Sequence, residues 1–301
     1  MTIKRFAIFL CLCVLLFVCF LSQSLLTGWG CRTESFSEPT RRDIAICVIY
    51  AYYEKDEMCR ENLRYFVEHG LQEKKEEGDN RLQMDYHFVV NGPVCSVNVN
   101  PRAKSNVHQH FRENRGYDFA AYSHVLKTLT LAGDIQKYDY FVFLNSSVRG
   151  PFYSLPSSQF WPLLFLQLFR GNVHLVGTSI NIHQNGEHPH VQSMFFMVDR
   201  QFYADLQRAN FFDEELINGY SFDDLIQKKE IGLSDLAIRT KGYNINCMLP
   251  KYRDLDYVYN VKQDINPTSH EGDPYYPGAY FGESIRPADV VFFKTNRGIA
   301  I

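Results

Sequence analysis

The sequence predicts an α/β protein with a mostly parallel sheet, and three observations support this class. Near-continuous apolar runs rich in β-branched and aromatic residues, suited to buried strands, occur at 43–53, 84–92 and 138–145. Segments with helical spacing of apolar residues separate these runs, which gives the alternation of strands and helices found around parallel sheets. The composition, 46% apolar and 22% charged, is typical of a globular protein.

The first element lies outside this domain. Residues 6–26 contain no charge and are long enough to span a bilayer as a helix. Because Lys4 and Arg5 precede them, we expect the N-terminus in the cytosol and the rest of the chain in the lumen or outside. A cleaved signal peptide is the alternative, but no small-x-small cleavage site precedes Thr27. The expected organisation is a cytosolic tail at 1–5, a transmembrane signal anchor at 6–26, a stem at 27–42 and a lumenal domain at 43–301.

The first half of the domain predicts regular strand–helix units. The expected order is a strand at 43–53, a helix at 57–75, a strand at 84–92, a helix at 117–133 and a strand at 138–145. Asp118 is the candidate N-cap of the second helix. In open parallel sheets ligands bind beyond the carboxyl ends of the strands, so Asn145, at such an end, lies where a ligand is expected.

The second half is less regular. We expect a helix at 160–171, strands at 173–182 and 190–199, a helix at 200–209, a helix ending at Gly242-Tyr243, a strand at 244–249 and a late strand at 290–293.

Several stretches resemble one enzyme group. The segments "ENRGYDFAAYSHVL" and "YDYFVFLNSSVRGPF" resemble the nucleotide-sugar half of GT-A type glycosyltransferases. The likeness is closer to the rhamnan-synthesis-F-like group, in which an "N-x-G-x-D" helix start and an "lNdSv-x-GP" strand end recur. It extends to "HVQSMFFMVDRQF", "EIGLSDLAIRTKGYNI" and "YFG…VVFFKTNR", and so covers most of the chain from about Ile44 onward.

The resemblance implies a single Rossmann-like GT-A type domain behind one transmembrane helix. It implies an enzyme that moves a hexosyl or deoxyhexosyl group from a nucleotide-sugar donor to a hydroxyl of a glycan or glycoconjugate. Together with the anchor, it predicts a single-pass type II protein of the Golgi or ER membrane.

The donor site is expected where the two motifs meet. Asn114 and Gly116 precede a helix, so backbone amides and the helix N-terminus can face a diphosphate, and Gly116 permits a close backbone approach. Asp118 can accept hydrogen bonds from ribose or sugar hydroxyls. The alternative is that these residues form an ordinary turn with a capping aspartate.

Asn145 and Ser147 stand where the related enzymes carry metal-binding carboxylates. An amide and a hydroxyl are poor partners for Mg²⁺ or Mn²⁺, so a divalent metal is disfavoured as a cofactor. Either the site works without a metal, with Arg149 as one cation near the diphosphate, or catalysis is lost. The basic segment with Lys294 and Arg297 is a further candidate for contact with the diphosphate.

A base for the acceptor hydroxyl is expected just before the helix that ends in "GY". The resemblance assigns this role to Glu230, with Asp235 as the weaker candidate because it falls inside the helix. The alternative for Glu230 is membership of a solvated charge run, "KKE". His190 and Gln192 lead into a strand beside the site and are candidates for acceptor binding.

Other classes find less support. The net charge is −3 and no basic stripe occurs, which disfavours a nucleic-acid partner. No metal-ligand set has characteristic spacing, so we assign no metal-binding residue. The main alternative is a non-catalytic lumenal protein that binds a nucleotide or a glycan on a transferase scaffold. The missing carboxylates favour that alternative.

Overall fold

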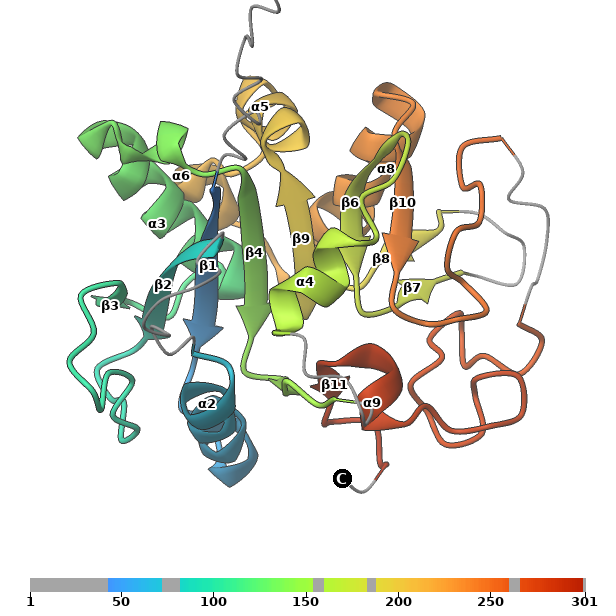
Figure 1. Ribbon diagram of the computed structural model, residues 1–301, viewed down its shortest axis with the longest axis horizontal. Coiled ribbons are helices and arrows are strands. Elements are labelled where there is room, and N and C mark those ends of the chain that lie inside the picture. The colour runs from blue at the N-terminus through green and yellow to red at the C-terminus, as the bar shows by residue number, and fades with distance from the viewer. Residues whose placement is uncertain (1–42, 72–81, 154–159, 183–187, 260–265, 300–301) are drawn as a thin grey trace, which may run out of the picture. The chain divides into compact units, whose positions relative to one another are not determined.

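The central sheet of the computed structural model has 7 strands in the order β10-β6-β9-β4-β1-β2-β3 (Figure 1). Strand β9 runs antiparallel to both of its neighbours, and the other pairings in this sheet are parallel. The structure describes residues 43–71, 82–153, 160–182, 188–259 and 266–299, which belong to a unit that begins at Asp43. A mostly parallel α/β sheet is therefore confirmed.

The predicted anchor at 6–26 and stem at 27–42 lie outside the described residues and stay predictions. Within the described part of the chain, every helix is too short or too polar to cross a membrane.

The strands of the central sheet are short to medium in length. They are β1 (Ile44–Tyr52), β2 (Leu82–Asn91), β3 (Val107–Arg112), β4 (Tyr140–Asn145), β6 (Val173–Gly177), β9 (Phe195–Asp199) and β10 (Asn244–Cys247). Two small sheets pair β5 (Val148–Arg149) with β11 (Phe293–Lys294), and β7 (Ile180–Asn181) with β8 (His190–Val191).

Helices connect these strands. They are α2 (Glu57–His69), α3 (Tyr117–Ala132), α4 (Trp161–Leu166), α5 (Arg200–Arg208), α6 (Glu214–Ile217), α7 (Phe222–Leu225), α8 (Gly232–Asp235) and α9 (Pro287–Val290). A 3₁₀ turn, η1 (Asp134–Lys137), follows α3, and two π-helical segments, η2 (Ile226–Ile231) and η3 (Leu236–Thr240), join α7 and α8 into one helical run over residues 222–240.

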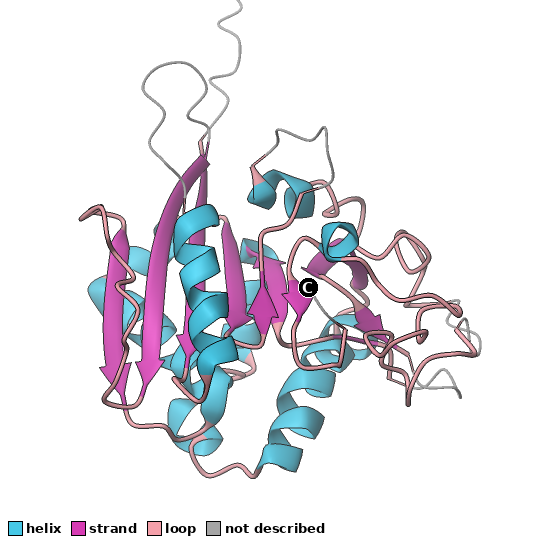
Figure 2. Ribbon diagram, turned by 90° about the horizontal axis from the view of Figure 1, so that it is seen from below, coloured by secondary structure: helices cyan, strands magenta, loops and turns pink. Residues whose placement is uncertain are grey.

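Both faces of the sheet are covered, as Figures 1 and 2 show. Neighbouring side chains of a strand point to opposite faces of the sheet, so Phe195 and Phe196 lie on different faces. Phe195 packs against Trp161 and Phe165 of α4, with ring centroids 6.1 and 4.4 Å apart. Phe196 lies 6.2 Å from Phe119 of α3. Apolar side chains are buried on both faces of the sheet. The strand sequences are therefore nearly continuous runs of hydrophobic residues.

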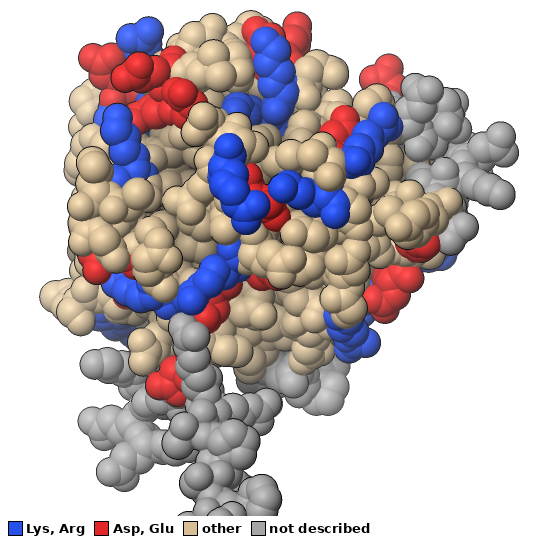
Figure 3. Space-filling model, turned by 90° about the horizontal axis from the view of Figure 1, so that it is seen from above, with Lys and Arg blue, Asp and Glu red and all other residues tan. Residues whose placement is uncertain are grey.

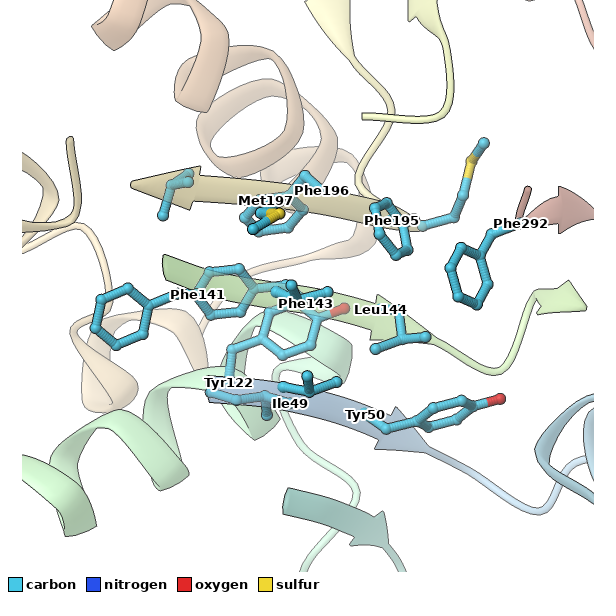
Figure 4. Packing of buried hydrophobic residues seen from close by; sticks show 14 of the residues in the cluster. Ile49, Tyr50, Tyr122, Phe141, Phe143, Leu144, Phe195, Phe196, Met197 and Phe292 are labelled. Carbon is cyan, nitrogen blue, oxygen red and sulfur yellow. The ribbon is translucent and has the colours of Figure 1, made fainter. Parts of the chain in front are cut away.

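The aromatic core continues into the C-terminal segment (Figure 4). Phe292, which is fully buried, stacks on Phe195 with centroids 4.6 Å apart and meets Trp161 edge-on at 5.2 Å. On the other face, Phe143 stacks on Phe196 at 4.6 Å. Offset and edge-to-face ring pairs add to the stabilisation that comes from burial alone. The segment after α9 is thus part of the core.

The predicted strand at 190–199 was wrong as a single element. Val191 and Ser193 donate their backbone N–H groups to the side chains of Ser234 and Glu230, not to a neighbouring strand. The ladder is therefore interrupted, and β8 and β9 belong to different sheets.

The predicted late strand at 290–293 was also wrong. Pro287 occupies the first turn of α9, where its missing N–H costs nothing, and the helix extends to Val290. Only Phe293 and Lys294 of this segment pair as a strand, with β5.

The N-terminal cap of α3 differs from the prediction as well. Gly116 is the capping residue and Asp118 lies inside the first turn, where a carboxylate is favourable.

Candidate active site

The parallel strands deliver their carboxyl ends to one edge of the sheet. In the register, Ile46–Ala51 of β1 lies opposite Tyr140–Asn145 of β4, so both strands end together. In Figure 1, α2, α9 and β11 lie beyond the arrowheads of β1 and β4. This is the edge at which α/β sheets bind ligands.

The two predicted donor-site motifs converge at this edge. Asn145 Nδ2, at the end of β4, donates a hydrogen bond of 2.8 Å to Asp118 Oδ2, in the first turn of α3. Asn145 Oδ1 accepts from the backbone N–H of Ser147 at 3.0 Å and from Ser147 Oγ at 2.6 Å. Asp118, Asn145 and Ser147 therefore form one network, while Asn114 lies exposed in the loop before α3.

Gly116 shapes the start of α3 through its backbone. Its φ is 65°, a left-handed value that glycine adopts without strain. A Cβ at this position would lie 2.7 Å from Cβ of Ala120 and 2.9 Å from Oδ1 of Asn218. Glycine is thus required for the packing of α3 against the end of α6. That requirement is independent of any ligand.

Glu230 belongs to the same side of the molecule. Glu230 Oε2 accepts hydrogen bonds from Ser193 N at 2.8 Å and from Ser193 Oγ, and Glu230 Oε1 lies 3.9 Å from His190 Nε2. Its side chain is 21% exposed, so it is not a member of a solvated charge run. Ser193 escaped the sequence analysis because a serine within an apolar run carries no distinctive signal.

The expectation that Glu230 precedes a helix was wrong. The helical run begins at Phe222 and continues to Thr240, and Glu230 lies in its π-helical part. The start is set by a capping box in which Ser221 and Asp224 exchange hydrogen bonds. The pattern S-x-x-D ahead of "LIQKKEI" was the signal available in the sequence.

Asp118 and Glu230 share an electrostatic environment. Burial raises the pKa of Asp118 above its usual value, the hydrogen bond from Asn145 opposes this shift, and the negative charge of Glu230 reinforces it. A carboxyl group with a raised pKa near a second carboxylate is a common feature of functional sites. The start of α3, the end of β4 and the π-helical segment therefore lie within electrostatic reach of one another.

The C-terminal segment completes the edge. Phe293 and Lys294 of β11 pair antiparallel with Arg149 and Val148 of β5, which directly follows Ser147. Thr295 donates its N–H to the carbonyl of Ser147 at 2.9 Å. Lys294 therefore lies beside the tip formed by residues 145–147.

Lys294 has an acidic partner that the sequence analysis missed. Lys294 Nζ lies 3.7 Å from Asp273 Oδ2, and Arg297 Nε donates to the same oxygen at 2.9 Å. Burial would raise the pKa of Asp273, but the charges of Lys294 and Arg297 outweigh it and hold the pKa below its usual value. Asp273 lies in a turn-rich segment without periodicity, so its position follows only from tertiary contacts.

Three other predicted residues are held by protein partners. The Arg149 guanidinium contacts α2, with Nε 2.8 Å from Asn62 Oδ1 and Nη2 2.7 Å from Glu61 Oε2. Gln192 is 1% exposed and accepts from Ser179 Oγ at 2.6 Å. Asp235 pairs with His188 and Arg239 at 2.8 and 3.0 Å. Their predicted contacts with substrate stay predictions.

The described residues include histidine, cysteine, aspartate and glutamate, whose side chains are common metal ligands. That part of the chain holds no group of three or more His, Cys, Asp or Glu side chains arranged to bind a metal ion. Its cysteines, Cys47, Cys59, Cys95 and Cys247, are free thiols.

Two cavities lie away from this edge network. One, of about 280 Å³, is lined by the end of α2 and by residues 100–104. The other, of about 510 Å³, lies between α3, α5 and residues 210–215. Neither contains a residue of the network around Asp118 and Glu230.

The opposite edge of the sheet has a different character. Figure 3 views the molecule from above in the orientation of Figure 1, and so faces the edge where β1 and β4 begin. Lysine and arginine alternate there with aspartate and glutamate, without a field of one sign. This face therefore presents no single-sign patch of the kind that binds a polyanion.

Comparison with solved structures finds several glycosyltransferases. A mannosyltransferase from Pyrobaculum calidifontis in complex with GDP-Man and Mn²⁺ is 14% identical, with 77% of this chain and 61% of that chain covered and a TM-score of 0.38. Mouse xyloside xylosyltransferase 1 is 9% identical, with 86% and 100% covered and a TM-score of 0.41. This chain thus spans less than two thirds of the mannosyltransferase's length.

A Drosophila beta-1,4-galactosyltransferase 7 mutant with manganese, UDP-Gal and xylobiose is 10% identical, with 72% of this chain and 71% of that chain covered and a TM-score of 0.31. No curated protein sequence matches this one.

The family comparison is more specific. The model of the family described as rhamnan synthesis protein F matches residues 88–265, more than half of the 301 residues. The matched region contains both donor-site motifs and Glu230. The match confirms the family, and with it the class of sugar-transferring enzymes, that the motifs predicted. The chain therefore belongs to the rhamnan synthesis protein F family of glycosyltransferases.

Proposed function

We propose that this protein moves a sugar from a nucleotide-sugar donor to a hydroxyl group of a glycan or glycoconjugate. One observation carries the proposal: the hydrogen bond of 2.8 Å between Asn145 and Asp118 joins the two donor-site motifs at the carboxyl edge of the sheet. Ligands of α/β sheets bind at this edge. The family match supports the same reading.

Glu230 is the proposed base. In an inverting transfer, a lone pair of the acceptor oxygen attacks the anomeric carbon while the bond to the diphosphate breaks and the nucleoside diphosphate leaves. The acceptor proton passes to Glu230. Ser193 N and Oγ hold Glu230 Oε2, which fixes the orientation of the carboxylate. General-base catalysis of this kind contributes about 10²–10⁴-fold to rate.

Asp118 is the proposed contact for donor hydroxyls. The Asp118 carboxyl already accepts from Asn145 Nδ2 at 2.8 Å and from the Phe119 N–H at 3.0 Å, and each oxygen has a further lone pair that can accept from a donor hydroxyl. The start of α3 also presents backbone N–H groups, and a helix N-terminus favours an anion.

The tip residues do not fit a divalent cation. Asn145 uses its amide oxygen to accept two hydrogen bonds from Ser147 and its amide nitrogen to bond Asp118. Mg²⁺ and Mn²⁺ prefer carboxylate oxygens, which this tip lacks. We therefore propose a metal-independent transfer.

The proposed setting is a membrane. Residues 6–26 form the proposed anchor of a single-pass type II protein, with the domain in the lumen of the Golgi or ER. Protease treatment of intact microsomes should leave the domain protected. Digestion of the domain without detergent would contradict this topology.

Nucleotide binding and turnover test the function. The full chain in detergent is titrated with UDP and GDP, with and without Mn²⁺, and then assayed for sugar transfer over a panel of nucleotide sugars. We expect binding of at least one nucleotide and turnover that survives EDTA. No binding of either nucleotide would refute the proposal, and loss of turnover in EDTA would refute metal independence.

The base has its own test. Glu230→Gln should lower turnover about 10²–10⁴-fold and leave nucleotide binding unchanged. Glu215→Gln, at an exposed acid of α6, makes the same change of charge elsewhere and should retain full turnover. Full turnover in Glu230→Gln would exclude Glu230 as the base.

A second function is favoured by one observation, the neutral tip at Asn145 and Ser147. On that reading the domain binds a nucleotide or a glycan without chemistry. Nucleotide binding without turnover over the whole donor panel would select it.

A further inference from the structure

Lys294 occupies a position fixed by the backbone. Antiparallel pairing sets Lys294 opposite Val148, one residue beyond the tip. Thr295 bonds the Ser147 carbonyl through both its N–H and its hydroxyl, at 2.9 and 3.0 Å. Asn62 of α2 then bonds both Ser146 and Thr295, each at 2.9 Å. The backbone of Lys294 is thereby held against the tip from two sides.

The Lys294 side chain is unusually buried for a cation. It is 11% exposed. Burial lowers the pKa of the ammonium group, and the negative charges of Asp273 and Glu230 counteract this shift. A buried ammonium is costly unless its charge is compensated. Lysine at this position therefore requires a function or a partner that outweighs the cost.

Asp273 provides only part of that compensation. Its closer partner is Arg297, at 2.9 Å, whereas Lys294 Nζ lies 3.7 Å away, beyond a good hydrogen bond. The ammonium has three donors. Two cations thus flank one carboxylate, and the charge of Glu230 also acts on Lys294.

We infer that Lys294 is the cation that binds the donor's diphosphate and stabilises the nucleoside diphosphate as it leaves. This inference rests on the proposed function and deepens it. As the bond from the anomeric carbon to the diphosphate oxygen breaks, its electron pair stays on that oxygen. A positioned ammonium in a desolvated site compensates this charge, the task that carboxylate-held metals perform elsewhere. Asp273 and Arg297 act as positioning residues.

A purely structural role makes a different prediction. If Lys294 only balanced the charge of Asp273, its removal would destabilise the surrounding segment. The affinities for all three ligands would then fall by the same factor. If Lys294 binds the diphosphate, its removal affects ligands in proportion to their phosphate charge. The ligand series of nucleoside, nucleoside monophosphate and nucleoside diphosphate separates the two.

The experiment measures these three affinities by calorimetry on the full chain in detergent, with the base that the wild type binds. We expect the wild type to prefer the diphosphate over the monophosphate. Lys294→Met should reduce the affinity for the diphosphate about 10- to 100-fold and leave nucleoside affinity unchanged. Lys294→Arg should retain most of the preference because it keeps the charge.

Two controls keep the test decisive. Arg286→Met removes an exposed cation of the same segment and should preserve the ligand preference. The double variant Lys294→Met/Asp273→Asn removes the Asp273 carboxylate together with the ammonium group. The double variant is used in place of Lys294→Met if thermal melting shows that Lys294→Met is unfolded. The double variant should show the same loss of diphosphate preference.

The outcomes distinguish this inference from the function. If the wild type binds no nucleotide, the proposed function fails and takes the inference with it. If the wild type prefers the diphosphate and Lys294→Met keeps that preference, the assignment of Lys294 alone is overturned. An equal loss of affinity for all three ligands, with the native melting temperature, also overturns it.

Discussion

Most described residues of 44–145 lie in strands and helices, whereas the described residues of 248–299 form one short helix and one two-residue strand among turns. Both regions reach the same edge of the sheet. The first region supplies Asp118 and Asn145, and the second supplies Asp273 and Lys294. A site can thus be framed by regular elements and completed by a segment with almost no secondary structure.

The two regions are held by different means. The strand region is stabilised by parallel ladders and by layers of apolar side chains. The later segment depends on single anchors, such as buried Asn266, whose amide bonds the Tyr252 hydroxyl and the Ala279 carbonyl, each at 2.8 Å. Turns without ladders need such side-chain partners to satisfy their backbone groups. Substitutions in the two regions should therefore differ in their effects on stability and on ligand binding.

The largest effect is expected at Phe292, the aromatic anchor of the later segment. Phe292→Ala should cost about 3–5 kcal/mol of unfolding free energy because it opens a cavity against Phe195 and Trp161. Phe143→Ala, in β4, is the matched control and should cost a similar amount. Denaturant unfolding measures both. A loss below about 1 kcal/mol at Phe292 alone would mean that the segment is docked loosely.

The second effect concerns Asn62, which links the two regions. Its side chain bonds Ser146, Thr295 and Arg149, so Asn62→Leu leaves several polar groups without partners. We expect a loss of about 2–3 kcal/mol and weaker diphosphate binding. Chemical denaturation and calorimetry measure these changes. Unchanged binding with reduced stability would show that the tip keeps its geometry without α2.

The third effect is a pH dependence that originates at His87 in the strand region. The pKa of His87 is lowered from 6.5 to about 3. Burial is the largest cause, and the positive charges that His108 and His110 can carry add to it. The unfolded chain therefore binds a proton below about pH 6.5 that the folded chain refuses until about pH 3. Stability should fall by about 2 kcal/mol between pH 7 and pH 5.

Substitution isolates this histidine. His87→Phe should flatten the acid limb of the stability profile, while His69→Gln, on the surface of α2, should leave it in place. The groups that face His87, namely Asp85, Lys137, His108 and His110, remain in both variants. An unchanged acid limb in His87→Phe would assign the effect to another group.

The smallest effect is expected at the ion pair between Arg149 and Glu61, 2.7 Å apart and half-exposed. Glu61→Gln should change stability by no more than about 1 kcal/mol, because solvent screens such pairs. The same variant tests whether release of Arg149 alters diphosphate binding. A stronger diphosphate affinity in this variant would support the predicted role of Arg149 as a phosphate ligand, and an unchanged affinity would count against it.

Much of the strand region was predictable because local pattern determines it. Strands such as β1 and β4 are buried on both faces, and their sequences are continuous apolar runs. Strand β3 escaped prediction because it is an edge strand whose residues are mostly exposed, as in "VHQHFR". The edge position removes the hydrophobic signal on which such predictions depend.

The site was predictable in part. Asn145 was found because turn residues after an apolar run mark a strand end, whereas the motif around Asp118 was found through its resemblance to the family. Asp273 and Ser193 were not, since their positions depend on contacts between residues far apart in sequence. Lys294 was singled out only as a basic residue, and its place beside the tip follows from a two-residue pairing too short to leave a pattern.

The pairing of β11 with β5 has a consequence for biosynthesis. Lys294 leaves the ribosome about 150 residues after its partner Val148, a delay of about 7–30 s at ordinary rates of translation. During that interval the nascent chain can assemble β1, β2 and β4, but the edge of β5 has no neighbour and the ammonium is not yet made. The strands β1, β2 and β4 can therefore form before Lys294, which pairs beside the 145–147 tip, has been synthesised.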